Sequence, residues 1–207
     1  MQITELFFSL QGEGKNTGLP TIFVRTTGCN LRCSYCDTTY AYQGGEHMET
    51  PAVIDAMRRW RCRRACITGG EPLLQEELPG LVDGLLADGY AIEVETNGSQ
   101  DIAWLTRRPV TISMDIKCPS SGMHAEMRME NLAALRPRDQ LKFVIGSRED
   151  YDYARSIVRE YEPSCPVVMQ PVWKSNVALA DWIVQDEIDV RLCLQLHKIL
   201  WGDRKGI

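Results

Sequence analysis

The sequence predicts an α/β protein built as a partial (β/α) barrel of about six parallel strands. Short runs rich in Val and Ile alternate with segments whose apolar residues repeat at helical spacing. Strands that alternate with helices usually form parallel sheets, which favours this class. The strand-like runs are too few for the eight βα units of a complete barrel. An open doubly wound sheet is the alternative architecture.

Candidate strands are short apolar runs, most of them bounded by Gly, Pro or polar residues, as strands usually are. No repeat, low-complexity tract or linker interrupts the series, so we expect one domain that spans residues 1–207. The candidate strands cover residues 21–25, 65–68, 91–95, 110–115, 141–145, 166–169 and 190–195.

Four helices are expected between these strands. Thr50 can cap the first, and the second covers residues 78–86 and ends near Gly89. Ser147 can cap a third helix, because a hydroxyl at this position accepts a hydrogen bond from the first turn. A fourth begins near Asn176.

Composition excludes several functional classes. Of 207 residues, 44% are apolar, which is enough for a core, and the net charge is −5. Nucleic-acid binding normally requires a basic surface, so no nucleic-acid partner is expected. Neither a secretory signal nor an apolar run of about 18 residues, long enough to span a bilayer, is visible. We therefore expect a cytoplasmic protein without a membrane partner.

Three closely spaced cysteines form the strongest local motif. Cys29, Cys33 and Cys36 follow directly on the strand 21–25, in a C-x3-C-x2-C pattern. Thiolates are the usual iron ligands of [4Fe–4S] clusters. Four thiolates would complete the ligation of the cluster, whereas three leave one iron able to bind another molecule. This motif therefore predicts a catalytic iron–sulfur site.

Two other interpretations compete for these cysteines. Structural zinc needs four ligands, and His47 is the nearest candidate for the fourth. A thioredoxin-like pair would use Cys33 and Cys36 but leaves Cys29 without a role. The remaining cysteines are expected to be buried, reduced thiols: Cys62, Cys66, Cys118, Cys165 and Cys193.

Polar residues stand at or just past the ends of several candidate strands. They are Arg25, Thr68, Glu95, Ser113 and Gln170. In barrel enzymes the carboxyl ends of the strands meet at one mouth, and that end carries the active site. We therefore expect these side chains and the cysteine loop to converge.

The motifs resemble those of the radical S-adenosylmethionine superfamily. These are the cysteine loop, with Tyr35 before its last cysteine, and the turn Gly69-Gly70-Glu71-Pro72. The segments Phe7-Phe8-Ser9-Leu10-Gln11-Gly12-Glu13-Gly14, Cys36-Asp37-Thr38 and Leu196-His197-Lys198-Ile199-Leu200 are more specific. Together they are similar to the 7-carboxy-7-deazaguanine synthase family over essentially the whole chain.

The resemblance implies a radical SAM barrel and a reaction. In that family 6-carboxy-5,6,7,8-tetrahydropterin undergoes ring contraction to 7-carboxy-7-deazaguanine with loss of ammonia, toward queuosine. The implied cofactors are a [4Fe–4S] cluster, S-adenosylmethionine and Mg²⁺. An electron donor such as flavodoxin and a homodimer are also implied. The alternative is a glycyl-radical-enzyme activating enzyme, which shares the cysteine loop but not the Gln11-Gly12-Glu13-Gly14 segment.

The resemblance also assigns roles to individual residues. It assigns the cluster to Cys29, Cys33 and Cys36, and Mg²⁺ to Thr38. The resemblance assigns contacts with the cofactor to Tyr35, Gly70, Glu71, Glu95, Ser113 and Gln170. Substrate contacts fall to Leu10, Gln11, Gly12, Glu13, Arg25, Thr68, His197 and Ile207.

Some of these residues also fit structural roles. Arg25 and Glu13 could form a surface ion pair of little energetic value. His197, at the end of an apolar strand, could be a hydrogen-bonded structural histidine. Asp115 and Lys117 stand where some relatives have a shorter Ser-Pro-Lys, so no role is assigned to them.

Overall fold

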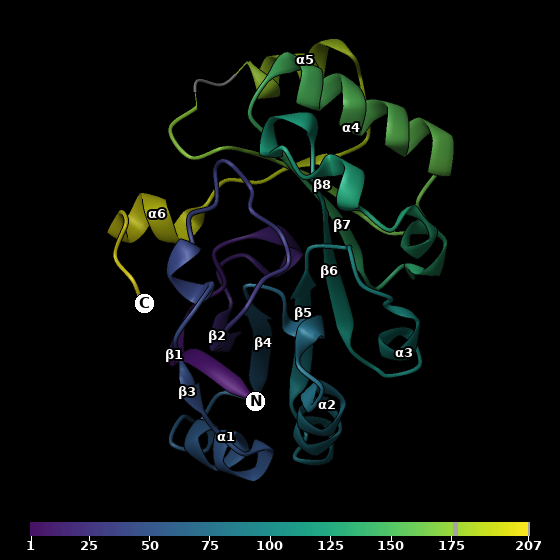
Figure 1. Cartoon of the computed structure of the whole chain (residues 1–207). Coiled ribbons are helices and arrows are strands. Elements are labelled where there is room, and N and C mark those ends of the chain that lie inside the picture. The colour runs from purple at the N-terminus through teal and green to yellow at the C-terminus, as the bar shows by residue number, and fades with distance from the viewer. Residues whose placement is uncertain (176–177, 207) are drawn as a thin grey trace.

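The computed structural model describes residues 1–175 and 178–206. Its centre is a curved sheet with helices along its outer side (Figure 1). The strands follow the order β3-β1-β2-β4-β5-β6-β7-β8-β9. Their bounds are β1 Gln2–Leu10, β2 Pro20–Thr26, β3 Glu46–His47, β4 Arg64–Gly69, β5 Ala91–Thr96, β6 Thr111–Ile116, β7 Gln140–Ile145, β8 Val167–Pro171 and β9 Arg191–Leu192.

The sheet is the partial barrel that the sequence predicts. From β2 to β9 neighbouring strands are parallel, and they succeed one another in chain order apart from the antiparallel β1 and β3. A doubly wound sheet instead reverses its strand order at a switch point, and no reversal occurs here. Among the described residues, no hydrogen bonds join β9 to β3, so the barrel stays open.

The observed strands differ from the predicted ones in two places. The first strand, β1, was not predicted from the sequence, because polar residues such as Glu5 and Ser9 interrupt its apolar pattern. The run 190–195 pairs with β8 only at Arg191 and Leu192. Its continuation is the helix α6, Leu196–Trp201, so His197 lies on a helix and not at the end of a strand.

The four expected helices correspond to α1, α2, α4 and α5, whereas α3 and α6 were not predicted. Thr50 is the first residue of α1 and does not cap it, because the N-cap position is Glu49. Ser147 caps α4 as predicted, since its Oγ accepts a hydrogen bond of 3.2 Å from the Asp150 amide. Asn176, the expected start of the fourth helix, lies outside the described residues. Within the described part of the chain, no helix is long and apolar enough to cross a membrane. The helices are α1 Thr50–Met57, α2 Leu78–Ala87, α3 Ala103–Thr106, α4 Arg148–Tyr161, α5 Leu179–Gln185 and α6 Leu196–Trp201.

Short 3₁₀ helices occupy several of the connections between these elements. One of them belongs to the connection between β1 and β2, and another follows the turn after β4. They cover Gly14–Asn16, Thr39–Ala41, Pro72–Leu74, Pro119–Ser121, His124–Glu126 and Met129–Ala134.

The two faces of the sheet differ in polarity. On the outer face, side chains such as Val24 and Ile67 are fully buried in the core that the helices cover. Successive side chains of a strand point to opposite faces, so their neighbours Arg25 and Thr68 point into the barrel. The interior is therefore polar, and the hydrophobic core that stabilises the fold lies outside the barrel.

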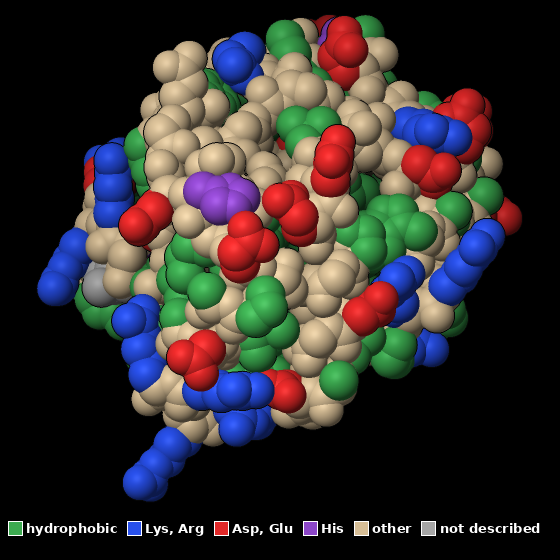
Figure 2. All heavy atoms as spheres, turned by 60° about the horizontal axis from the view of Figure 1, so that its bottom comes forward, with side chains coloured by type: hydrophobic (Ala, Val, Ile, Leu, Met, Phe, Trp, Pro, Cys, Tyr) green, Lys and Arg blue, Asp and Glu red, His purple; other side chains and the backbone are tan. Residues whose placement is uncertain are grey.

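The outer surface shows no concentration of positive charge on the face in Figure 2. Basic and acidic side chains are interspersed there, with apolar side chains between them. This distribution agrees with the net charge of −5.

Candidate active site

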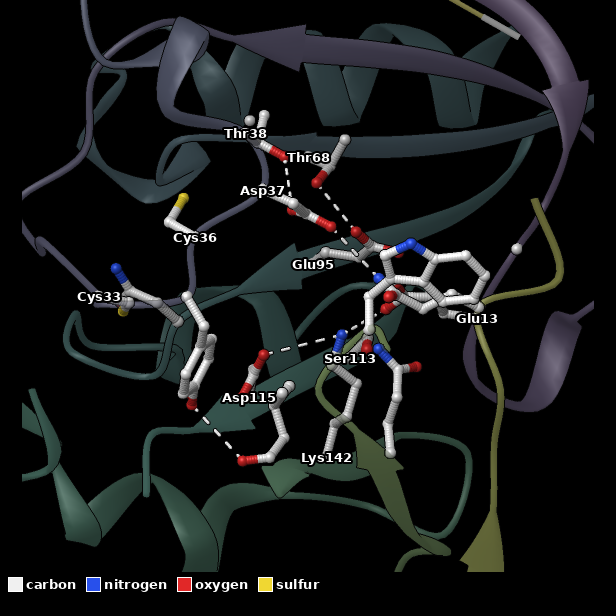
Figure 3. A pocket seen from close by; sticks show the side chains of 18 of the residues that line it. Glu13, Cys33, Cys36, Asp37, Thr38, Thr68, Glu95, Ser113, Asp115 and Lys142 are labelled. Atoms are coloured by element: carbon white, nitrogen blue, oxygen red, sulfur yellow. Dashed lines mark hydrogen bonds and ion pairs between the residues drawn. The ribbon is translucent and has the colours of Figure 1, made fainter. Parts of the chain in front are cut away.

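A cavity with a volume of about 600 Å³ opens inside the barrel. Five parallel strands contribute to its wall through the polar residues that the sequence singled out. Figure 3 shows Cys33 and Cys36 on one side of this cavity, with Glu13 and Glu95 on the other. The structure thus brings together Arg25, Thr68, Glu95, Ser113 and Gln170, as expected.

Backbone hydrogen bonds hold the cysteine loop. The loop starts after β2, and the Gly28 amide donates to the Ala41 carbonyl at 2.8 Å. The Gly28 carbonyl accepts from the Glu71 amide at 2.7 Å, and the Ser34 amide donates to Ser121 at 3.0 Å. All three cysteines of the loop line the cavity. These backbone hydrogen bonds set the position of the loop that carries the three cysteines.

The turn after β4 packs directly against this loop. A Cβ atom on Gly70 would lie 2.1 Å from the Gly28 carbonyl oxygen, so only glycine allows this approach. Glu71 is fully buried behind the cavity wall. Its carboxylate accepts hydrogen bonds from the amides of Leu73 and Asn97, at 3.0 and 2.6 Å. The Glu71 side chain thus supports the turn, and Gly70 presents its backbone to the cavity.

Burial and hydrogen bonding shift the pKa of the Glu71 carboxyl in opposite directions. Loss of solvent raises the pKa of its carboxyl to about 7, although the amides of Asn97 and Leu73 and the Thr96 hydroxyl favour the charged form. A carboxyl that accepts these hydrogen bonds is held in one orientation, which suits a residue that fixes a turn.

The amino-terminal end of the barrel is filled by the loop between β1 and β2, residues 11–19, which we call the floor loop. The Gly14 amide approaches the Cys193 Sγ at 3.2 Å, and the Lys15 amide donates to Gln140 at 2.8 Å. A Cβ atom on Gly12 would lie 2.0 Å from the Nδ1 of His197. The floor loop therefore joins the first strands to the opposite edge of the open barrel.

Buried charges form a network above the floor loop. Lys142 on β7 pairs with Glu13 at 2.6 Å and lies 3.7 Å from Asp115 on β6. Asp115 also pairs with Lys117 at 2.9 Å. Burial opposes the charge of Lys117, but Asp115 and the nearby Cys33 outweigh it and raise the pKa of the Lys117 ammonium. Two ammonium groups thus remain charged inside the barrel.

The segment before α6 bridges the floor loop and the cysteine loop. The side-chain amide of Gln195 donates a hydrogen bond to the Glu13 carboxylate at 2.8 Å and another to the Asp37 carboxylate at 3.2 Å. Lys198 also pairs with Asp37, whose other oxygen accepts from the Thr38 hydroxyl at 3.0 Å. Segments from both ends of the chain therefore meet beside Cys36, the last cysteine of the loop.

Comparison with known proteins decides the family. The model of the radical SAM superfamily matches residues 23–136. A 7-carboxy-7-deazaguanine synthase of Koribacter versatilis is 40% identical to this chain over the full length of both. The chain belongs to the 7-carboxy-7-deazaguanine synthase family.

Other synthases and solved structures agree with this membership. The synthase of Thermoplasma acidophilum is 39% identical over the full length of both chains. That of Rhodospirillum rubrum is 50% identical and covers 96% of this chain and 91% of its own. The crystal structure of QueE from Escherichia coli superposes with a TM-score of 0.74 over 95% of this chain and 94% of that one. At 22% identity this last likeness concerns the fold.

The three cysteines suit the cluster of a radical SAM synthase better than a zinc ion. In the described part of the chain, one group of three metal-ligand side chains converges within 4.8 Å, and it contains none of these cysteines. Their sulfurs therefore do not surround one ion, whereas in a [4Fe–4S] cluster each thiolate binds a different iron. His47, the candidate fourth zinc ligand, pairs with Glu49 and does not line the cavity.

Nearly all residues that resemblance to the synthase family assigned line this cavity. Glu71 lies behind the wall, and Ile207 lies outside the described residues. The alternative of an Arg25–Glu13 surface ion pair is wrong, because Arg25 pairs with Glu5 at 2.6 Å and Glu13 pairs with Lys142. The cavity residues are Leu10, Gln11, Gly12, Glu13, Arg25, Cys29, Cys33, Tyr35, Cys36, Thr38, Thr68, Gly70, Glu95, Ser113, Gln170 and His197.

The sequence analysis missed several residues of the synthase cavity. Lys142 carried a signal, since a lysine inside the apolar run of β7 must point into a polar interior. Its register partner on β6 is Asp115, which shares the interior face. Gln195 carried no such signal, because it reaches the site only through the return of the chain before α6. Lys198 lies in the segment 196–200 that resembles the family, but its pairing with Asp37 was not predicted.

The buried pair of Glu13 and Lys142 predicts a measurable change in stability. Although burial opposes the charge of Glu13, Lys142 and Gln195 hold the pKa of this carboxyl well below its usual value. Glu13→Gln leaves Lys142 without its closest counter-charge, so we expect the free energy of unfolding at pH 7 to fall by about 3 kcal/mol. Urea denaturation measures this difference, with the exposed Glu160→Gln as control.

The pH dependence of this effect has a definite sign. Because the pKa of Glu13 is lower in the folded than in the unfolded chain, its contribution is complete above about pH 4.5. It is lost as the pH falls below that value toward the folded pKa. The difference between wild type and Glu13→Gln should therefore shrink below pH 4.5, and a difference that grows there would contradict this account.

Proposed function

We propose that the chain catalyses the ring contraction of 6-carboxy-5,6,7,8-tetrahydropterin to 7-carboxy-7-deazaguanine, with loss of ammonia. This reaction leads toward queuosine and other 7-deazapurines. Membership of the synthase family supports it. The observation that carries it is structural: the three-cysteine loop and the residues assigned to the pterin line one cavity.

The chain's own residues divide the work of binding and orientation. Cys29, Cys33 and Cys36 would hold the [4Fe–4S] cluster, which would supply the single electron needed to start radical chemistry at C6 of the pterin. The backbone at Gly70 and the side chains of Glu95, Ser113 and Gln170 hold the cofactor. The Arg25 guanidinium binds the substrate carboxylate, and Glu5, 2.6 Å from its Nε, fixes its orientation.

The buried ammonium groups serve the same acidic substrate. Lys142 lies in the wall of the cavity between Glu13 and Asp115, where its charge is retained. A positive charge in this position favours binding of a carboxylate-bearing pterin over a neutral one. The floor loop closes the amino-terminal end, which limits the access of water to the reacting atoms.

The alternative activity, activation of a glycyl-radical enzyme, is not favoured, because the similar curated proteins reported above are synthases. Anaerobic reconstitution with iron and sulfide, followed by assay with 6-carboxytetrahydropterin, tests the proposal. We expect 7-carboxy-7-deazaguanine and ammonia in equal amounts. A fully loaded, reduced cluster that gives no product from this pterin would overturn the assignment.

Thr38 is proposed to bind Mg²⁺ through its hydroxyl. Mg²⁺ prefers oxygen ligands in octahedral geometry and keeps few protein ligands beside substrate and water. The Thr38 hydroxyl lies in the cavity wall, 3.0 Å from the Asp37 carboxylate, so a second oxygen ligand stands beside it.

Thr38→Ala should therefore raise the Mg²⁺ concentration needed for half-maximal turnover by about tenfold or more. Iron and sulfide content should not change, since the thiol ligands remain. Thr39→Ala is the matched control, because Thr39 is exposed and does not line the cavity. Wild-type turnover of Thr38→Ala at limiting Mg²⁺ would show that this hydroxyl is not a ligand.

The remaining properties follow the family resemblance. We propose that the chain acts in the cytoplasm as one domain, receives electrons from a donor such as flavodoxin, and forms a homodimer. Exposed apolar side chains near the carboxyl terminus offer a surface for self-association, which analytical ultracentrifugation can measure. They are Leu192, Leu194, Ile199, Leu200 and Trp201.

A further inference from the structure

Below the cavity, three side chains converge around the amide of Gln11. The Sγ of Cys66 and one carboxylate oxygen each of Glu93 and Glu95 lie within 4.8 Å of one another. The Gln11 Nε2 is 3.6 Å from Cys66 and 3.1 Å from each carboxylate. An amide nitrogen thus stands where a cation would stand, so this cluster holds the floor loop and not a metal.

Glu93 binds the floor loop at two points. One of its carboxylate oxygens accepts from Gln11, and the other accepts from the side-chain amide of Asn16. Glu93 is only 5% exposed and does not line the cavity. Its carboxylate is therefore fully engaged with the floor loop and is shielded from any ligand.

Glu95, two residues along the same strand, makes a different set of contacts. It accepts from Gln11 with one oxygen and from the Thr68 hydroxyl, at 2.9 Å, with the other. Glu95 lines the cavity, whereas Glu93, two residues earlier on β5, does not. The two carboxylates thus accept hydrogen bonds from the side-chain nitrogen of Gln11 and fix its orientation. The side-chain oxygen of Gln11 accepts a hydrogen bond of 3.3 Å from the backbone amide of Glu13.

These contacts link Glu93 to the residues assigned to the pterin. Gln11 and Glu13 both line the cavity, and Glu13 continues the chain of contacts to Lys142. Loss of the Glu93 carboxylate would free Asn16 and leave the Gln11 amide with Glu95 alone as its carboxylate partner. Of the assigned cofactor contacts, Gly70, Ser113 and Gln170 lie outside β5. Glu95 lies on β5 beside Glu93, but its own hydrogen bonds to Gln11 and Thr68 do not involve the Glu93 carboxylate.

We propose that Glu93 is a positioning residue for substrate binding, which fixes Gln11 and Glu13 through the floor loop. The proposal rests on the proposed function. Two properties separate it from a merely structural role. Its loss should affect binding of the pterin more than the turnover rate, and it should leave binding of S-adenosylmethionine unchanged.

Glu93→Ala and Glu93→Gln, made in the full chain and reconstituted anaerobically, test the proposal. Loss of hydrogen bonds to a buried carboxylate predicts a KM for 6-carboxytetrahydropterin raised about tenfold or more in Glu93→Ala. We expect kcat to change by less than about threefold. Glu93→Gln keeps one acceptor oxygen and should give an intermediate KM. The Kd of S-adenosylmethionine and the iron content should equal those of wild type.

Asp139→Asn is the matched control. Asp139 is a fully buried carboxylate at the amino end of β7, bonded to Arg136 and to the Ile112 amide. Its replacement should destabilise the chain without changing the KM for the pterin. If Asp139→Asn raises the KM as much as Glu93→Ala does, the effect is general destabilisation and the proposal is overturned.

Hydrogen exchange gives a readout that does not need turnover. The amides of Gln11 and Gly18 donate to carbonyls across the floor loop, each at 2.8 Å. In Glu93→Ala we expect residues 11–19 to exchange faster, and in Asp139→Asn to exchange at the wild-type rate. Unchanged exchange, or faster exchange with an unchanged KM, overturns the proposal. Failure of wild type to convert the pterin contradicts the proposed function, and exchange then still decides whether Glu93 anchors the floor loop.

Discussion

Replacing Cys33 by Ala should remove the [4Fe–4S] cluster and all turnover. Three thiolates supply every protein ligand in the proposed site, so loss of one leaves a second iron without a protein ligand. Cys29→Ala and Cys36→Ala should have the same effect, since all three side chains line the cavity. Iron and sulfide analysis and the visible absorption of anaerobically reconstituted protein measure the loss.

The other five cysteines provide controls of the same chemistry. None of them lines the cavity in the described structure, so Ala in their place should leave cluster content at the wild-type level. Cys66 is the strictest of these controls, because it lies beside Gln11 under the cavity. A full cluster in Cys33→Ala would end the cluster assignment. The control positions are Cys62, Cys66, Cys118, Cys165 and Cys193.

Substrate deuterated at C6 should transfer label into S-adenosylmethionine, and one equivalent of this cofactor should support many turnovers. In the proposed function, substrate and cofactor share this cavity, and near-attack geometry places one hydrogen within about 3–3.5 Å of the atom that takes it. Abstraction should therefore be confined to C6. Because the proposed reaction returns a hydrogen to the product, the cofactor is regenerated. Mass spectrometry of the recovered cofactor measures the label.

Arg25→Ala should lose most of this turnover while cofactor still binds. The substrate carboxylate loses its charged partner, and Glu5 loses the guanidinium 2.6 Å away. The double variant Glu5→Gln/Arg25→Ala removes both charges. It shows whether turnover falls because substrate binding is lost or because the partly buried Glu5 carboxylate is left unpaired. Arg108→Ala is the control, because Arg108 pairs with the half-exposed Asp83 away from the cavity.

The opposite result has a clear meaning. Stoichiometric loss of S-adenosylmethionine, with no deuterium in the remaining cofactor, would favour the glycyl-radical activating enzyme. Full activity of Arg25→Ala would agree with the ring-contraction chemistry but would show that Arg25 does not bind the substrate carboxylate. Lys142, which also lines the cavity, would then be the next candidate for that role.

The elements of the parallel sheet could be predicted because their signals are local. Runs such as 65–68 and 141–145 are mostly apolar, since one face of each parallel strand is buried under the outer helices. The first strand gave a weaker signal. β1 is antiparallel and only partly buried along most of its length, so polar residues are allowed along it.

Within the site, the predictable residues were those at strand ends and in compact motifs. Cys29, Cys33 and Cys36 lie within one loop, and Thr68 and Glu95 follow from the rule that parallel strands end at the same edge. Side-chain roles within a motif were less predictable. Glu71 belongs to the Gly-Gly-Glu-Pro turn, yet its carboxylate serves the backbone behind the wall.

The sequence by itself determined the parallel α/β class, the three-thiol loop and the end of the barrel at which the site lies. Each of these follows from residues that are near one another in the chain or from a general rule of parallel strands. Only the tertiary structure decided which charges are paired. The partners Glu13–Lys142, Glu5–Arg25 and Glu93–Asn16 are separated by 129, 20 and 77 residues. Such pairs form because a charged group removed from solvent requires a charged or polar partner, and sequence order does not specify which one.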